Sequence, residues 1–159
     1  MIPESNNASE ATVYRNYQGG YFRTLISPAQ SGGRLAVLDM VLPKGSEPPP
    51  HVHEKEDESF YVLEGEISFF VNNTEFRRRS GESLFAPRMV HHCFKIITES
   101  ARMLTILTPG NFWNYFVEFS EPCYTTPKIM NPFPPSDEQL TRLIETLSDK
   151  YAVTVLNGL

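Results

Sequence analysis

Two histidines separated by one residue begin a run of side chains that could hold a metal ion. His51 and His53 follow three prolines and precede an acidic segment in the stretch GSEPPPHVHEKEDESFYVLEG, residues 45–65. Side chains two residues apart on a strand project from the same face, so both imidazoles can approach one point. Imidazole nitrogen is a common ligand of divalent transition metals. The spacing therefore predicts a pair of metal ligands.

One carboxylate of the same segment is expected to join this pair. Glu58 shares a strand phase with Phe60 and Val62, two apolar residues expected in the core. A carboxylate at such a position needs a cation or a dense set of hydrogen bonds, because burying it alone costs several kcal/mol. Glu58 is therefore the third candidate ligand. The other acidic residues are predicted to lie in a turn and to face water: Glu54, Glu56 and Asp57.

The two remaining histidines of the chain are adjacent, so only one of them can face the interior. His92 shares a strand phase with Phe94, whereas His91 shares one with Cys93. Because phenylalanine is the better core residue, His92 is predicted to be the fourth ligand and His91 to point outward. The alternative is a His91–Cys93 metal pair, which would leave His92 without a role.

The segments around these residues predict mainly β structure. Eight short strands are expected, at 21–26, 35–42, 59–63, 66–72, 74–78, 83–86, 93–97 and 102–107. Clusters of glycine, asparagine and serine separate them, as at a turn. Many short strands at near-regular spacing indicate a closed barrel or a sandwich.

The chain changes character after Gly110. The aromatic run NFWNYFVEFS, residues 111–120, predicts a short buried helix that ends before Pro122. Ser136 and Gln139 form a capping box that opens a second helix. An apolar stripe on this helix is expected to pack on the outside of the β body, with a partner helix as the alternative; its members are Leu140, Leu143, Ile144 and Leu147. A last short strand is expected within 151–156.

The composition excludes several classes of function. A chain of 159 residues is long enough for one domain with a real core. Its net charge of −5 argues against a nucleic-acid surface or a polybasic membrane contact. No apolar stretch has the length of a membrane span, and the polar N-terminus lacks the pattern of a signal peptide, so a cytoplasmic location is expected. The two cysteines form no CxxC motif and predict no disulfide framework.

The spacing of these motif residues resembles that of the cupin family. The first cupin motif, G-x5-H-x-H-x4-E-x6-G, is matched by Gly45, His51, His53, Glu58 and Gly65. The second motif, G-x5-P-x-G-x2-H-x3-N, is matched by Gly81, Pro87 and His92. Two positions depart from it, since Met89 replaces the internal glycine and Ile96 replaces the asparagine. All four ligand positions are intact.

The resemblance implies an all-β fold: a cupin double-stranded β-helix, or jelly-roll barrel, with short C-terminal helices packed outside. A single cupin domain is expected over residues 1–159, with metal-binding motifs at 45–65 and 81–96 and a helical C-terminal extension at about 111–150. The whole chain resembles small single-domain bacterial cupins of the quercetin 2,3-dioxygenase-like group. That group implies a homodimer and one divalent transition metal (Fe, Mn, Ni, Cu or Zn) held by His51, His53, Glu58 and His92.

The same resemblance implies a metal-dependent dioxygenase that uses O2 and a small hydroxylated substrate, with Glu58 as the catalytic base. Apolar side chains are expected around the metal, and they favour an apolar or aromatic substrate over a sugar phosphate. The expected lining residues are Met40, Phe60, Phe85, Phe94, Met103, Phe112 and Phe116. Two alternatives are a non-catalytic cupin that binds a metal or small molecule, and a metal-dependent isomerase.

Overall fold

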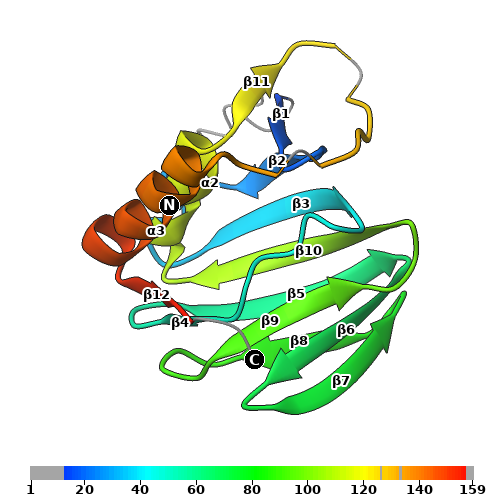
Figure 1. Cartoon of the computed structure of the whole chain (residues 1–159), viewed down its shortest axis with the longest axis horizontal. Coiled ribbons are helices and arrows are strands. Elements are labelled where there is room, and N and C mark those ends of the chain that lie inside the picture. The colour runs from blue at the N-terminus through cyan, green and yellow to red at the C-terminus, as the bar shows by residue number, and fades with distance from the viewer. Residues whose placement is uncertain (1–12, 126, 133, 157–159) are drawn as a thin grey trace, which may run out of the picture.

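The computed structural model describes residues 13–125, 127–132 and 134–156, and these form two antiparallel sheets that share one core (Figure 1). The larger sheet has the strand order β11 (Glu121–Cys123), β1 (Tyr14–Tyr17), β2 (Gly20–Ile26), β3 (Ala36–Pro43), β10 (Ser100–Thr108), β5 (Asp57–Glu64) and β8 (Ser83–Ala86). The smaller sheet has the order β12 (Val153–Val155), β4 (His51–His53), β9 (His92–Ile96), β6 (Glu66–Val71) and β7 (Thr74–Arg79). This arrangement confirms the predicted double-stranded β-helix.

Period-two alternation builds the core from the inner faces of both sheets. Along β10 every second residue is buried, from Ala101 to Leu107, and the residues between them are partly exposed. Residues of β5 alternate in the same way, with Phe60 and Val62 inside. The smaller sheet supplies Phe69 and Phe94, whose rings lie 5.8 Å apart, and Phe60 reaches Phe69 across the core at 5.0 Å. The two faces therefore meet in one apolar interior.

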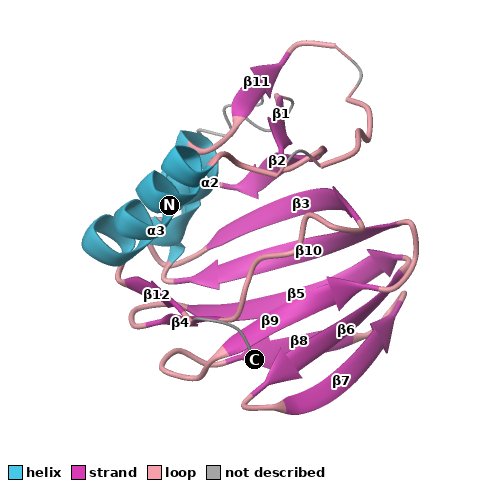
Figure 2. Ribbon diagram, in the orientation of Figure 1, coloured by secondary structure: helices cyan, strands magenta, loops and turns pink. Residues whose placement is uncertain are grey.

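The helices lie at one corner of the molecule (Figure 2). They are α1 (Pro28–Ser31), the 3-10 turn η1 (Gly110–Phe112), α2 (Trp113–Glu118) and α3 (Asp137–Tyr151). The capping box that was predicted at Ser136 is present, because its hydroxyl accepts from the amide of Gln139 and the Gln139 side chain accepts from the amide of Ser136. The start of the second predicted helix therefore agrees with its sequence signal.

Only two of the four residues in the apolar stripe of α3 pack on the β body. Leu147 is buried and Leu143 is partly buried against the core, whereas Leu140 and Ile144 are 41% and 39% exposed. The prediction that the whole stripe packs inward is therefore wrong for Leu140 and Ile144. The C-terminal end of α3 also contacts α2, because the hydroxyl of Tyr151 donates a hydrogen bond to Glu118.

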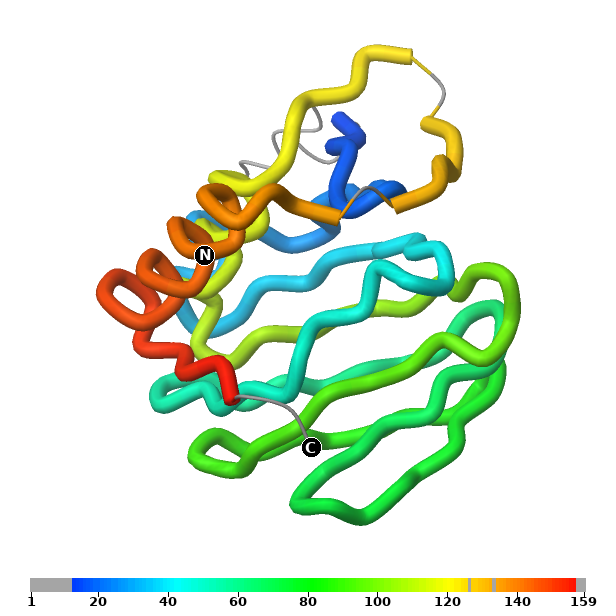
Figure 3. Tube along the Cα trace, in the orientation of Figure 1, coloured from blue at the N-terminus to red at the C-terminus, as the bar shows by residue number. Residues whose placement is uncertain are grey.

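The last part of the chain returns to the barrel (Figure 3). Strand β12 pairs with β4, placing Val153 opposite His53 and Val155 opposite His51. The sequence predicted this strand but missed β1, β11 and the one-turn helix α1. These elements are short and polar, so they carry no clear apolar periodicity. Among the described residues, no helix is both long enough and apolar enough to cross a membrane.

Gly65 closes the first cupin motif for a steric reason. Its φ angle is +85°, in the left-handed region that side chains disfavour. A Cβ atom there would also lie 2.7 Å from the carbonyl oxygen of Ser100 and 2.7 Å from the hydroxyl of Thr98. Glycine is required because the turn from β5 to β6 runs directly against the start of β10.

Candidate metal centre

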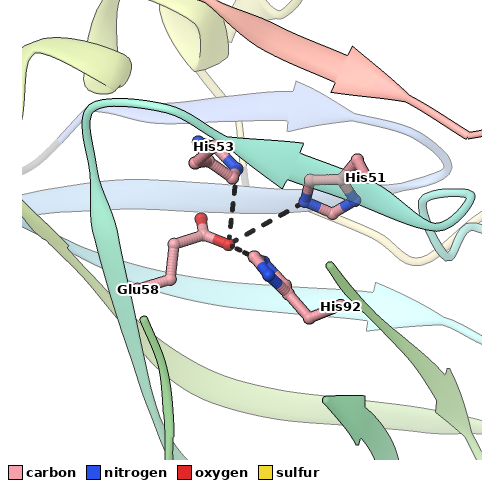
Figure 4. A group of neighbouring side chains, drawn as sticks. All are labelled: His51, His53, Glu58 and His92. Carbon is pink, nitrogen blue, oxygen red and sulfur yellow. Dashed lines mark hydrogen bonds and ion pairs between the residues drawn. The ribbon is translucent and has the colours of Figure 1, made fainter. Parts of the chain in front are cut away.

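The four predicted ligand candidates converge at one point between the two sheets (Figure 4). Glu58 comes from β5 of the larger sheet, whereas the three histidines come from β4 and β9 of the smaller sheet. One ligand atom from each side chain lies within 4.8 Å of all the others. The carboxylate oxygen Oε2 of Glu58 lies 2.8 Å from His92 Nε2, 3.6 Å from His53 Nε2 and 4.0 Å from His51 Nε2.

The register of the smaller sheet explains this convergence. His51 and His53 lie two residues apart on β4 and share a face, as their spacing predicted. Strand β9 pairs with β4 at a single position, where His51 lies opposite His92. Glu58 enters from the facing sheet, on the same inner phase as Phe60. The cluster therefore joins both sheets at the end of the barrel where β4 lies.

The cluster is deeply buried. His53, His92 and Glu58 are 1%, 4% and 5% exposed, and His51 is partly buried, with 12% of its side chain exposed. Buried ionisable groups are costly unless they are paired or coordinate a metal. His51 is the least covered of the four, so the side of the cluster nearest to solvent lies at this residue.

Burial and mutual charge perturb the acid–base properties of the cluster. Burial alone would raise the pKa of Glu58, but the three neighbouring histidines outweigh it and lower that pKa to about 2. Burial lowers the pKa of His51 to about 4, and repulsion from His92 acts in the same direction. For His92 burial favours a lower pKa, but its hydrogen bond to Glu58 outweighs this effect and raises the pKa. Glu58 is therefore an anion that faces three imidazoles.

The donor set fits a metal ion. His53 Nε2 is buried and has no hydrogen-bond partner among the described residues, although it points into the cluster. An unsatisfied buried polar atom costs roughly 1–3 kcal/mol, and coordination to a cation would remove that cost. Three imidazole nitrogens and one carboxylate oxygen are the ligand types that first-row transition metals accept. The cluster can therefore hold one divalent transition metal.

The Nδ1 atoms of His51 and His92 face backbone carbonyl groups, and these contacts turn Nε2 toward the cluster. His51 Nδ1 lies 2.8 Å from the carbonyl oxygen of Pro49, and His92 Nδ1 lies 3.1 Å from the carbonyl oxygen of Val90. An oxygen acceptor at Nδ1 keeps a proton there, so Nε2 is the nitrogen that faces the cluster; in His92 it donates to Glu58 when protonated and can coordinate a metal when deprotonated. Both rings consequently present Nε2 to the centre of the cluster.

One acidic residue differs from its prediction. Glu56 was expected to face water from a turn, but it is only 3% exposed, and its Oε2 lies 3.5 Å from His53 Nδ1. The turn between β4 and β5 is tight, so a residue three positions after His53 folds back against its ring. That spacing is the signal that could have identified Glu56.

The neighbours of Glu56 take other positions. Glu54 is exposed, as predicted. Asp57 begins β5 instead of lying in the turn, and it accepts hydrogen bonds from the backbone amide and the guanidinium of Arg88.

The second histidine of the adjacent pair lies outside the cluster. His91 Nε2 lies 3.0 Å from the side-chain oxygen of Asn73. Cys93 is buried on the phase of β9 opposite to His92 and Phe94. The group of potential ligands found within the described ranges contains His92 and neither His91 nor Cys93, so the structure gives no support to the alternative His91–Cys93 pair.

The predicted lining residues divide into three groups. Phe112 contacts the cluster directly, since its ring meets that of His53 edge-to-face at 4.5 Å, and Phe116 packs on Phe112. Four others are buried in the barrel core: Met40, Phe60, Phe94 and Met103. The placement of Phe85 is wrong, because β8 pairs Ala86 with Glu58 and so turns Phe85 to the outer face, where it is 58% exposed.

Two tyrosines near the cluster were not identified from the sequence. The hydroxyl groups of Tyr17 and Tyr115 lie 3.3 Å apart, and the ring of Tyr115 stacks on Phe112 at 4.8 Å. Burial raises the pKa of both hydroxyls, and the negative charge of Glu58 adds to this increase. Tyr17 lies on the short strand β1, whose polar sequence gave no signal of an inward-facing position.

Comparison with known proteins agrees with this architecture. Residues 38–107 match the family model described as Cupin domain. Quercetin 2,3-dioxygenase from Bacillus subtilis is 27% identical over 100 residues, which cover 63% of this chain and 30% of that enzyme. The chain spans between 30% and 64% of the lengths of the curated relatives that it matches.

Two solved structures share the fold. A RmlC-like cupin from Shewanella frigidimarina has a TM-score of 0.55 at 20% identity, covering 69% of this chain and 96% of that one. A predicted oxalate decarboxylase from Thermotoga maritima has a TM-score of 0.54 at 27% identity, covering 64% of this chain and 95% of that one. With both motifs, the two-sheet barrel and the buried histidine–glutamate cluster in place, residues 38–107 of this chain are a cupin domain and the chain has the cupin fold.

Proposed function

We propose that this cupin holds one divalent transition metal through His51, His53, Glu58 and His92, and that it is a metal-dependent dioxygenase. The observation that carries the proposal is the buried Nε2 of His53, which points into a cluster of suitable ligands and has no hydrogen-bond partner within residues 13–125, 127–132 and 134–156. Similarity to quercetin 2,3-dioxygenase supports the choice of reaction class. The substrate class that we propose is a small, apolar or aromatic compound that carries a hydroxyl group.

A bound redox-active metal would supply Lewis-acid activation of a substrate oxygen and electron exchange with O2. Glu58 contacts the three histidines through Oε2, so its other oxygen can accept the proton of a substrate hydroxyl. Phe112, Tyr115 and Phe116 form an aromatic wall beside His53 and limit the access of water from that side. These aromatic faces favour an aromatic or apolar substrate body.

O2 uptake tests this proposal. The chain is stripped of metal and reloaded separately with Fe, Mn, Ni, Cu or Zn, and each form is mixed with a panel of flavonols and enediols. We expect O2 consumption with at least one redox-active metal and none with the His53→Ala variant. Metal binding without uptake on any compound would indicate a non-catalytic binding protein. Turnover of a compound without O2 would indicate an isomerase.

Two further features of the protein stay predictions. We propose that the chain forms a homodimer, for which light scattering would give twice the 18.1 kDa mass of one chain. A monomer mass at micromolar concentration would contradict the homodimer. The cytoplasmic location rests on the sequence alone and stays an expectation.

A further inference from the structure

Glu56 is a buried carboxylate that faces a ligand candidate. It lies in the turn between β4 and β5, is 3% exposed, and places Oε2 3.5 Å from Nδ1 of His53. It also contributes to the wall of a surface pocket of about 580 Å³ that α2 and α3 border. Glu56 therefore borders this pocket and also the Nδ1 side of the His53 ring.

Among the described residues, His53 is the one histidine of the cluster whose Nδ1 faces a side chain. Backbone carbonyl groups occupy the Nδ1 positions of His51 and His92, and these acceptors do not depend on residue type. At His53 the corresponding acceptor is the carboxylate of Glu56. The ring is held on another side by the perpendicular contact with Phe112. The orientation and ring form of His53 can therefore be changed by one substitution.

We propose that Glu56 is a positioning residue that accepts a hydrogen bond from Nδ1–H of His53 and thereby keeps the lone pair of Nε2 directed into the cluster. This inference rests on the proposed metal site. The contact of 3.5 Å is longer than an ordinary N–H···O hydrogen bond. Coordination at Nε2 makes the opposite N–H more acidic, so metal binding should strengthen the contact. Carboxylate–histidine pairs of this kind change metal affinity by roughly 10–100-fold when the carboxylate is removed.

The test compares Glu56→Ala and Glu56→Gln with the wild-type protein, and it uses Zn(II) as a diamagnetic probe. Glu54→Ala is the matched control, because Glu54 lies in the same turn and is exposed. The first readout is the ¹⁵N chemical shifts of the His53 ring in the metal-free protein, at a pH well above the ordinary histidine pKa. The second readout is the Kd for Zn(II), measured by competition with a chelator.

We expect wild-type His53 and the Glu54→Ala variant to carry the proton on Nδ1, and Glu56→Ala to shift the proton toward Nε2. The Kd for Zn(II) should rise by roughly 10–100-fold in Glu56→Ala. It should rise less in Glu56→Gln, because the amide oxygen can still accept the hydrogen bond, and it should not change in Glu54→Ala. If Glu56→Ala does not fold, the isosteric Glu56→Gln variant carries the Kd readout, with the smaller rise.

Two results would overturn the role of Glu56: a proton on Nε2 in the wild-type protein, or a ring form and a Kd that do not change in either Glu56 variant. A different result would contradict the proposed metal site itself. In that case the wild-type protein binds no Zn(II), while the ring form of His53 still responds to Glu56.

Discussion

The backbone amide of Met89 donates a 2.8 Å hydrogen bond to the carbonyl oxygen of His53. This bond ties the turn of the second cupin motif to the strand that carries two ligand candidates. Met89 stands at the motif's glycine position, and its φ angle is +65°. Met89 therefore adopts a left-handed conformation, which glycine adopts more readily than methionine. Met89 is 67% exposed, so little packing compensates for the strain.

Met89→Gly is expected to stabilise the fold. A left-handed conformation costs a residue with a side chain roughly 1–2 kcal/mol, and substitution by glycine removes this cost. Part of the resulting stabilisation is lost because glycine makes the unfolded chain more flexible. The net increase in the free energy of unfolding should be roughly 0.5–1 kcal/mol, measured by urea denaturation. Met89→Leu keeps the strained conformation and should be neutral. A loss of stability in Met89→Gly would show that the methionine side chain makes contacts that matter.

The second departure from the second cupin motif, Ile96, is compensated by Glu47, a residue of the first cupin motif. Ile96 replaces the motif asparagine and is 1% exposed, and its backbone amide donates a 2.9 Å hydrogen bond to Glu47. Glu47 also accepts from the amide of Gly45. One carboxylate thus fastens the proline-rich segment before β4 to the edge of β9. An asparagine side chain is not needed to join the two motifs here.

Strand phase made the ligand candidates predictable, because alternation along β5 and β9 is regular enough to fix which residues face inward. Glu58 and His92 were found in this way, although 34 residues separate them. Phase failed at β8, where Leu84, Phe85 and Ala86 are all apolar and the sequence does not say which of them face the core. The pairing of Glu58 with Ala86 decides it. Glu56 was missed because a turn residue has no strand phase.

Loss of either buried histidine should remove the metal, whereas loss of the adjacent surface histidine should not. His53→Ala and His92→Ala each delete one nitrogen of the cluster, so metal per chain should fall at least about tenfold in elemental analysis. His91→Ala is the matched control, because His91 lies against Asn73. Equal losses in all three variants would contradict the assignment of His92 to the inner phase.

Metal binding should raise thermal stability in a reversible manner. A ligand that binds only the folded state at 100 times its Kd stabilises that state by about 2.7 kcal/mol. For a domain of this size the Tm should rise by roughly 5–10 °C on saturation with Zn(II) and fall again when EDTA is added. Differential scanning fluorimetry measures both changes. An equal rise in His53→Ala would place the bound metal outside the cluster.

Asp39 should give the fold a pH-dependent stability that does not involve the metal. It is 5% exposed on β3 and accepts hydrogen bonds from Arg102 of β10 and Arg23 of β2. These bonds, above all those from Arg102, outweigh burial and lower the pKa of Asp39 below its ordinary value of 3.8. A carboxylate whose pKa is lowered by folding contributes its full stability at pH values above its ordinary pKa. It loses this contribution as the pH falls toward the lowered pKa of the folded state.

Asp39→Asn should therefore reduce the free energy of unfolding by about 2 kcal/mol at neutral pH, and the difference should shrink below about pH 4. Glu64→Gln is the control, because Glu64 faces the same Arg102 at 3.4 Å but is 71% exposed in its side chain, so its loss should cost less than about 1 kcal/mol. Urea denaturation across this pH range measures both variants, and a difference for Asp39→Asn that does not depend on pH would show that lost packing, and not charge, causes its effect.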